Sequence, residues 1–364
     1  MMPDPTIKRV LMEEGTSTHA LTQRILRRLS DTPVQLTTGN GSCERAGETD
    51  MGKGTLHLLN YKGGFLKACP GTKKYICCGY QILNLSTNCP LDCSYCILQS
   101  YFSEPNLRVF ANFEERLGEV VRSIDNSPDR IFRIGTGEFA DSLALDPLIG
   151  WTDILAPLFF KRKNAILELK TKTANIEGLI ALPERSQIVV SWSLNSPTIV
   201  DREEHRAPSL RKRLEAAARC QEEGFIVGFH FDPLIPHRNW KDGYLRTLDL
   251  LDRFIDPHRI IWISMGSFRF MPQLKSIIAQ RHPDTRVLDG EFVPGVDGKM
   301  RYFKPIRMEL YFFMREHLEK WGNELGLYLC MESDEIWKKT MGWSPGDSAG
   351  LSCFLDKRVK EFFG

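Results

Sequence analysis

The stretch STNCPLDCSYC, residues 86–96, places three cysteines on one short loop: Cys89, Cys93 and Cys96. A structural zinc site usually closes with four ligands, and a disulfide uses two sulfurs. Iron–sulfur clusters are held by thiolates, and three thiolates on a four-iron cubane leave one iron open. The spacing therefore predicts a [4Fe-4S] cluster with a free coordination position, which is what a catalytic metal site keeps.

Two other interpretations of the loop stay open on these residues alone. A zinc ion could take its fourth ligand from another cysteine nearby in the sequence, namely Cys69, Cys77 or Cys78. The thiols could also be buried and inert, as free cysteines often are.

The composition favours a globular protein of the reducing cytosol. The chain has 364 residues, of which 42% are hydrophobic, and a net charge of +2, so a nucleic-acid partner is permitted but not indicated. No apolar run approaches the roughly 18 to 20 residues of a membrane span, and the N-terminus has no signal-peptide core. We expect a cytoplasmic protein without a membrane partner. Its ten cysteines do not make a disulfide scaffold at this length.

Short β-rich runs alternate with amphipathic helical stretches from residue 81 to residue 282. Examples are RIFRIGTG, AILELKTKT, QIVVSWSLNS, FIVGFHFDPLI and RIIWISMGSF. Such alternation indicates βαβ units and a parallel sheet. Six units predict an α/β fold of the partial (β/α)6 TIM-type barrel kind, although an open doubly wound sheet also fits. We expect a short N-terminal region (1–80), the barrel (81–282) and a C-terminal hairpin and helical extension (283–364).

Polar residues cluster just after the expected strands. They are the cysteine loop, residues 135–141, Lys172, Ser193, Asn195, Asp232, Ser267 and Arg269. The carboxyl ends of parallel strands are where sites form in these folds. Because every strand contributes, one cup-shaped site is expected, and this favours the barrel-like curl.

The segment CPLDCSYC, residues 89–96, resembles the signature of the radical S-adenosylmethionine (radical SAM) superfamily. The resemblance implies that the open iron is chelated by S-adenosylmethionine. It also implies that one electron from the reduced cluster yields a 5′-deoxyadenosyl radical, which abstracts a hydrogen atom from the substrate. In such enzymes the protein positions the reactive groups and excludes competing reactions.

A longer match extends from residues 73–102 to about residue 313 and includes LTQRIL, residues 21–26. Over this span the chain is similar to the spore photoproduct lyase family and its photolyase-like relatives. The resemblance implies a carbon–carbon lyase that repairs a thymine dimer in DNA, and an electron donor of small-molecule, flavodoxin or ferredoxin type. Radical modification of a nucleotide, RNA or peptide stays an alternative. So does a metal-bearing nucleic-acid-binding protein without turnover.

The same resemblance implies which residues meet the cofactor. The segment GTGE, residues 135–138, is similar to the glycine-rich segment that holds the cofactor's amino group, and a cation at Lys172 suits the cofactor's carboxylate. The full implied set is Tyr95, Gly137, Glu138, Ala140, Asp141, Lys172, Ser193 and Asn195.

Two positions depart from the family pattern. Glu138 stands where the lyases carry the cysteine that returns a hydrogen atom, and Ile97 stands where they carry a tyrosine after the last cluster cysteine. A carboxylate cannot donate a hydrogen atom as a thiol does. The expected catalytic positions are Tyr95 and Glu138. Cys77 or Cys78 is expected to replace the family's cysteine as the hydrogen-atom donor.

The segment DGKMRYFKP, residues 297–305, resembles the hairpin that the lyases push into DNA. Lys299, Arg301 and Lys304 are expected to hold phosphates, and Tyr302 to stack on a base. A solvated basic hairpin without a partner is the alternative.

Overall fold

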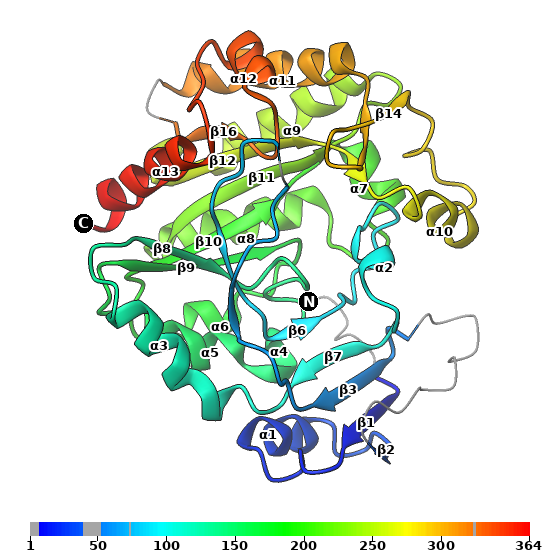
Figure 1. Ribbon diagram of the computed structural model, residues 1–364, viewed down its shortest axis with the longest axis vertical. Helices are drawn as coiled ribbons and strands as arrows, with labels where there is room; N and C mark the ends of the chain where they lie inside the picture. Colours follow the sequence, from blue (N-terminus) through cyan, green and yellow to red (C-terminus); the bar gives the residue numbers. More distant parts are fainter. Residues whose placement is uncertain (1–6, 39–51, 73, 323–324) are drawn as a thin grey trace.

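A curled, mostly parallel β-sheet forms the centre of the computed structural model, which describes residues 7–38, 52–72, 74–322 and 325–364 (Figure 1). Its eight strands lie in the order β16-β12-β11-β10-β9-β8-β5-β4, and only β4 runs antiparallel to its neighbour. The bounds are β4 (Leu66–Ala68), β5 (Gln81–Leu83), β8 (Phe132–Gly135), β9 (Ala165–Thr171), β10 (Ile188–Ser193), β11 (Ile226–Leu234), β12 (Ile260–Ser267) and β16 (Leu327–Leu329). The predicted partial barrel is confirmed, with one further strand at each edge.

The central strands are buried along their whole length, which is why they read as apolar runs rather than as alternating ones. All six residues of β10 are buried. Val190 of this strand pairs with Leu169 of β9 on one side and with Val227 of β11 on the other. These registers bring the carboxyl ends of the strands to one edge of the sheet.

Helices cover the outer face of the sheet, and α8, α11 and α13 pack directly against its strands. Several begin at a side-chain cap; for example, the Ser196 hydroxyl accepts from Ile199 N at 3.4 Å, directly before Pro197. The helices are α1 (Ala20–Arg28), α2 (Leu98–Tyr101), α3 (Leu117–Asp125), α4 (Asp146–Ile149), α5 (Trp151–Leu155), α6 (Glu177–Ile180), α7 (Pro197–Glu203), α8 (Leu210–Glu222), α9 (Trp240–Phe254), α10 (Leu274–Arg281), α11 (Lys304–Leu318), α12 (Asp334–Met341) and α13 (Ser348–Phe363).

A second, smaller sheet lies below the barrel in the view of Figure 1 and carries the cysteine loop at its edge. Its order is β2-β1-β3-β7-β6, with bounds β1 (Arg9–Glu13), β2 (Val34–Thr37), β3 (Thr55–Leu59), β6 (Ser86–Thr87) and β7 (Leu107–Phe110). The sequence predicted a short N-terminal region here and assigned none of the strands β1, β2 and β3. The cysteines follow β6 directly. The division into three regions stays a prediction.

The predicted C-terminal hairpin is present as β14 (Phe292–Pro294) and β15 (Met300–Tyr302), which form a three-stranded sheet with β13 (Arg269–Phe270). Helix α11 follows it, as expected. In the described part of the chain, no helix has both the length and the apolar character that crossing a bilayer demands.

The two ends of the curled sheet meet through a short antiparallel bridge. Ile76, just before β5, donates its N–H to the carbonyl of Glu332, just after β16, at 2.9 Å. The Glu332 side chain is fully buried and accepts from Arg307 at 3.2 Å and from the Tyr311 hydroxyl at 2.9 Å. The backbone of Glu332 therefore makes the bridge, and its buried carboxylate joins the same residue to α11.

We predict that Glu332→Ala lowers the free energy of unfolding by about 3–5 kcal/mol, because it leaves the buried Arg307 charge without a partner. Urea-induced unfolding measures the change. The control is Glu335→Ala, since Glu335 is solvent-exposed and pairs with the surface residues Lys304 and Lys339; it should change the midpoint far less. Equal midpoint shifts in the two variants would contradict the role given to Glu332.

Candidate functional site

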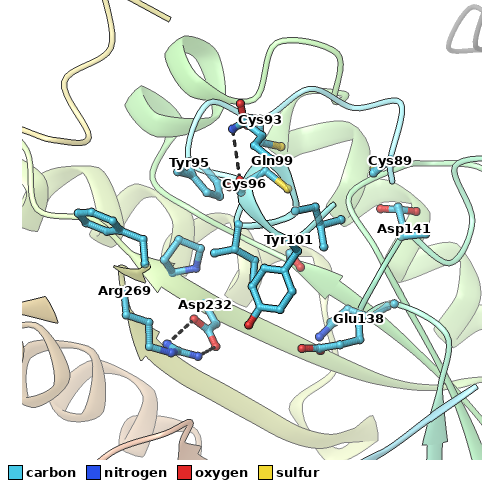
Figure 2. Close-up of a pocket in the computed structure, with 18 of the residues that line it drawn as sticks. Cys89, Cys93, Tyr95, Cys96, Gln99, Tyr101, Glu138, Asp141, Asp232 and Arg269 are labelled. Carbon is cyan, nitrogen blue, oxygen red and sulfur yellow. Dashed lines mark hydrogen bonds and ion pairs between the residues drawn. The ribbon is translucent and has the colours of Figure 1, made fainter. Parts of the chain in front are cut away.

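A large cavity of about 1030 Å³ opens at the carboxyl edge of the barrel sheet (Figure 2). It takes residues from the cysteine loop and from the ends of strands β8 to β12 and β16. Those from the strand ends include Glu138, Lys172, Ser193, Asp232, Arg269 and Cys330. The cup-shaped site expected from the strand-end polar residues is therefore present.

The three cysteines of the loop lie together on one wall of this cavity. Cys89, Cys93 and Cys96 all line it, and none forms a disulfide. The Gln99 side chain donates to the backbone carbonyls of Ser94 at 2.8 Å and Cys96 at 3.2 Å, which holds the loop's turn. Burial raises the pKa of Cys89 to about 12 and that of Cys93 well above its usual value. Such thiols release their protons to a metal rather than to water.

A buried ion pair anchors the loop from beneath. Tyr95 donates its hydroxyl to Glu204, and Arg213 of α8 donates to the same carboxylate; both Arg213 and Glu204 are fully buried. Next to it, Ser94 donates its hydroxyl to Glu203. Burial alone raises the pKa of Glu204, but the charges of Arg213 and Lys172 and the Tyr95 hydrogen bond outweigh it and hold the pKa below its usual value. The hydroxyl of Tyr95 is thus used in a hydrogen bond to Glu204 that positions the loop.

Most of the expected cofactor residues line the cavity beside the cysteines: Tyr95, Gly137, Glu138, Ala140, Asp141, Lys172 and Ser193. Lys172 Nζ lies 5.7 Å from the centre of the Tyr95 ring. Gly137 packs closely against the end of β9, since a Cβ there would lie 2.9 Å from the Cβ of Lys170, so its backbone carries no side chain. These residues place a cation, a carboxylate and a bare backbone edge within the same cavity.

Asp141 has its carboxylate occupied by the fold. It accepts from the backbone N–H groups of Lys172 at 2.7 Å and Leu143 at 3.0 Å, and from the Thr171 hydroxyl at 2.7 Å. Burial raises the pKa of Asp141, and these hydrogen bonds partly offset the effect. Its observed role is to join the ends of β8 and β9, and through them to place Lys172.

Asn195 is not among the residues that line the cavity, so its assignment to the cofactor stays a prediction. Its Nδ2 donates to the carbonyl of Pro233 at 2.8 Å, and its Oδ1 accepts from the Tyr244 hydroxyl at 2.7 Å. The side chain is 1% exposed. Packing beneath the strand end, rather than the cavity, uses its hydrogen bonds.

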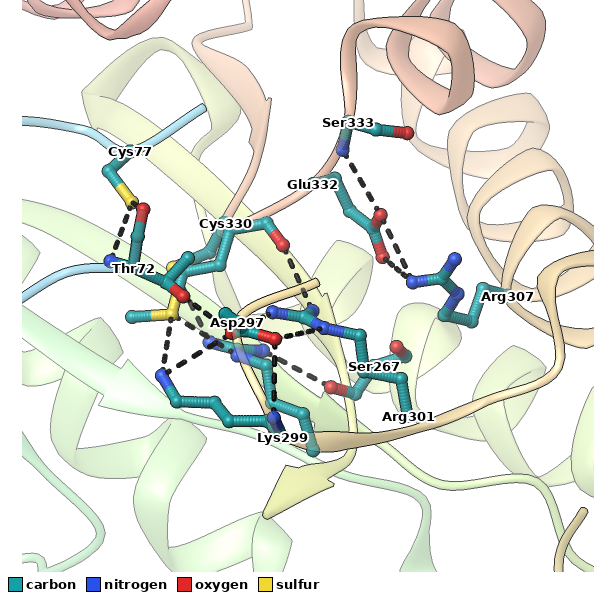
Figure 3. Close-up of polar contacts among 12 residues, drawn as sticks. Thr72, Cys77, Ser267, Asp297, Lys299, Arg301, Arg307, Cys330, Glu332 and Ser333 are labelled. Atoms are coloured by element: carbon teal, nitrogen blue, oxygen red, sulfur yellow. Dashed lines mark hydrogen bonds and ion pairs between the residues drawn. The ribbon is translucent and has the colours of Figure 1, made fainter. Parts of the chain in front are cut away.

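Two residues of the expected DNA hairpin, Arg301 and Tyr302, are buried in the structure, and their contact with DNA stays a prediction. Arg301 is 2% exposed and donates to Asp297 at 2.7 Å, and its guanidinium lies 4.0 Å from the centre of the Tyr75 ring (Figure 3). Tyr302 is 1% exposed and stacks on Phe292 at 4.5 Å. Both stabilise the hairpin from inside. Lys299 lines the cavity, and Lys304 pairs with Glu335 on the surface.

The cavity also contains the strand-end residues Asp232 and Arg269, together with Lys170 and Tyr101, which the sequence did not single out. Asp232 accepts from Arg269 through both carboxylate oxygens, at 3.0 and 2.9 Å. Lys170 sits among Glu138, Glu168 and Asp232; burial lowers its pKa, but these carboxylates outweigh it and hold the pKa above its usual value. Tyr101, one helical turn after Ile97, projects into the cavity with 43% exposure (Figure 2). An i, i+4 search from Ile97 would have found it.

Cys77 and Cys78, the substitute donors expected from the sequence, do line the cavity, and so do Cys69 and Cys330. Cys330 was missed because it follows β16, an apolar run of only three residues that no periodicity criterion could identify as a strand. Only the pairing of β16 with β12 shows that Cys330 belongs to the cavity.

Among the described residues, no three His, Cys, Asp or Glu side chains converge on a single metal ion, so the donor set suits a cluster in which each of the three thiolates binds its own iron. Three free thiols share one cavity wall, Lys172 and Glu138 lie in the same cavity, and its volume of about 1030 Å³ accommodates the cluster and a chelating cofactor. A half-barrel with three cysteines after its first strand and a cup at the strands' carboxyl ends defines the class of radical SAM proteins.

Comparison with known proteins gives the family. The family model described as "Spore photoproduct lyase" matches residues 8–304, so the chain belongs to the spore photoproduct lyase family. A spore photoproduct lyase of Clostridium acetobutylicum is 23% identical over 88% of this chain and 96% of its own length. That of Bacillus subtilis is 25% identical over 57% of this chain and 61% of its own length.

Solved structures show the same fold. A mutant spore photoproduct lyase with bound AdoMet and dinucleoside spore photoproduct superposes with a TM-score of 0.78, at 22% identity, over 91% of this chain and all of the other. The likeness extends beyond the barrel to nearly the whole chain.

We predict that Glu204→Ala weakens the cysteine loop. It removes the partner of the buried Arg213 and the acceptor of Tyr95, so the free energy of unfolding falls by about 3 kcal/mol or more. The reconstituted variant should also retain less iron per chain than the wild type. Glu215→Ala on α8, where Glu215 forms an exposed pair with Arg211, is the control. Unchanged iron content in Glu204→Ala would show that the loop does not depend on this anchor.

Proposed function

We propose that this protein is a radical SAM lyase that repairs the spore photoproduct, a thymine dimer, in DNA. The observation that carries the proposal is the wall of Cys89, Cys93 and Cys96 facing a cavity with Lys172 and Glu138, in a chain of the spore photoproduct lyase family. The cluster and S-adenosylmethionine, when bound, supply hydrogen-atom abstraction by a carbon radical.

The cysteine side of the cavity is the cofactor half. Cys89, Cys93 and Cys96 would hold the [4Fe-4S] cluster through three irons. Lys172 would pair with the carboxylate of S-adenosylmethionine, and Glu138 would accept from its amino group. The backbone at Gly137 and Ala140 and the hydroxyl of Ser193 complete this wall. Because the Asp141 carboxylate accepts hydrogen bonds from the ends of the strands, its contribution is to fix the position of Lys172.

The opposite side of the cavity suits a pyrimidine pair. The Tyr101 ring offers a face on which a base can stack. Lys170, Asp232 and Arg269 offer hydrogen-bond donors and acceptors of the kind that read the polar edges of an extruded base. Lys299, from the loop before β15, adds a cation beside them.

The hairpin of β14 and β15 is the part we assign to DNA. With Arg301 and Tyr302 buried, its outward residues are apolar: Val293 is 39% and Val296 is 62% exposed. Apolar side chains of this kind wedge between base steps in proteins that distort DNA. Lys299 and Lys304 then remain as the hairpin's candidates for phosphate contact.

The chain departs from its family at the hydrogen-return step. Glu138 cannot donate a hydrogen atom, and Ile97 lacks the phenol of the family's tyrosine. Cys77 and Cys78 remain predictions for that role. The electron donor, whether a small molecule or a protein of flavodoxin or ferredoxin type, also stays a prediction.

We predict that single substitutions Cys89→Ala, Cys93→Ala and Cys96→Ala each abolish the iron–sulfur absorption of anaerobically reconstituted protein. Each removes one of only three thiolates, and two cannot hold the cluster. Cys220→Ala is the matched control, because Cys220 is buried in α8 away from the cavity. A triple variant that kept its cluster would contradict the metal assignment.

We predict that the reconstituted protein, with S-adenosylmethionine and dithionite, converts a dinucleoside spore photoproduct into the repaired thymine dinucleoside and forms 5′-deoxyadenosine. Liquid chromatography with mass spectrometry measures both products, and Cys93→Ala serves as the inactive control. Formation of 5′-deoxyadenosine without loss of the lesion would exclude this substrate and favour radical modification of another one.

A further inference from the structure

Repair by hydrogen abstraction leaves the substrate short of one hydrogen atom. Once the lesion has lost a hydrogen atom and its bridging bond has broken, a carbon radical remains, and a donor in the same cavity must complete the product. The geometry points to Cys330 as the residue that donates this hydrogen atom, an inference that rests on the repair activity proposed above.

Cys330 occupies the place in the fold where functional residues gather. It directly follows β16, and its N–H donates to the carbonyl of Met265 in β12 at 2.7 Å. Since β16 runs parallel to β12, Cys330 lies at the carboxyl edge of the sheet, where sites of such barrels form. It lines the same cavity as Lys172 and the cysteine loop, and belongs to the wall formed by Asp232 and Arg269.

The thiol is held by a preorganised cation. Arg269 Nη2 donates to Cys330 Sγ at 3.6 Å, while the same guanidinium pairs with both oxygens of Asp232. Gly266 makes room for this arrangement, since a Cβ there would lie 2.7 Å from the carboxylate carbon of Asp232. Because the sulfur accepts from Arg269, its own S–H stays available to a group in the cavity.

The protonation state also suits a donor of hydrogen atoms. Burial and the charge of Asp232 raise the pKa of Cys330 well above its usual value, against the opposing effect of Arg269. The residue is therefore a thiol at neutral pH. A nucleophile or a metal ligand needs the thiolate, whereas hydrogen-atom donation needs the S–H bond that this environment preserves.

The other cavity thiols are placed less well. Cys77 donates its S–H to the Thr72 carbonyl at 3.6 Å and accepts from Thr72 N at 3.3 Å (Figure 3). Cys78 precedes β5 and lines the same cavity close to Cys330, but the Arg269 guanidinium holds the sulfur of Cys330. Cys69 follows β4, whose Ala68 pairs with the first residue of β5, Gln81, which puts it at the amino side of β5. Cys330 alone of these four follows a parallel strand.

The step balances with one external electron. The S–H bond of Cys330 breaks and a C–H bond forms on the substrate radical, which leaves a sulfur-centred radical. One electron from the same low-potential donor that reduces the cluster, with one proton from solvent, restores the thiol.

The test compares reconstituted wild type with Cys330→Ala in D₂O, where the thiol carries deuterium. The wild type should make repaired dinucleoside with one solvent deuterium. In Cys330→Ala, lesion consumption should continue, but the yield of repaired product should fall by about tenfold as the radical is diverted to by-products. Cys77→Ala and Cys78→Ala test the two rival donors, and Cys220→Ala, whose thiol lies outside the cavity, is the matched control; all three should keep both yield and label. Equal yield and deuterium in Cys330→Ala, or their loss in one of these three variants instead, would overturn the assignment.

A second measurement needs no turnover. Maleimide labelling at alkaline pH, read by peptide mass spectrometry, should be slowed at Cys330 by the dinucleoside lesion but not at the exposed Cys353. The lesion's Kd should be the same in Cys330→Ala as in wild type, because the thiol acts on the radical and not on binding. A bound lesion that leaves Cys330 labelling unchanged would also overturn the inference. If wild type leaves the lesion intact in every assay, the repair reaction itself fails and this inference fails with it.

Discussion

The buried pair of Arg213 and Glu204 is the interaction on which the site depends. It joins α8, on the outer face of the barrel, to the cysteine loop, which springs from the second sheet, and it holds Tyr95 between them. Two charges removed from water are stable only while each satisfies the other. Removing either charged partner would leave the other one buried and unpaired. The ion pair therefore ties the loop to the barrel and keeps the three cysteines at fixed positions beside the cavity.

The cavity has two chemically distinct halves. The side near the cysteines carries Lys172, Glu138 and a bare backbone edge, which suit a zwitterionic cofactor. The side near β12 and β16 carries the Asp232–Arg269 pair and Cys330, with the hairpin above it. A radical formed in one half must act in the other, so the curl that brings the two sheet edges together through Ile76 and Glu332 is part of the chemistry as well as of the fold.

Long apolar runs made the barrel strands predictable from the sequence, whereas short or polar strands could not be predicted from it. Strands β9 to β12 are buried on both faces, so the sequence shows each of them as a long apolar run. The three-residue β16 and the N-terminal strands carry too few residues to show a period. The burial of single side chains escaped prediction for a related reason: Asn195 is polar at the expected position, yet its side chain bonds Tyr244, which lies 49 residues away in the sequence.

The sequence alone predicted the metal chemistry, because the spacing of Cys89, Cys93 and Cys96 is local and indicates that these three sulfurs share one cluster. It also determined the parallel sheet and the edge at which polar residues gather. Only the tertiary structure decided which of those residues reach the cavity and which thiols face it. The physical reason is that a side chain's direction depends on packing and on hydrogen-bond partners far away along the chain. Cys330, about 230 residues from the cluster loop, enters the site solely through strand pairing.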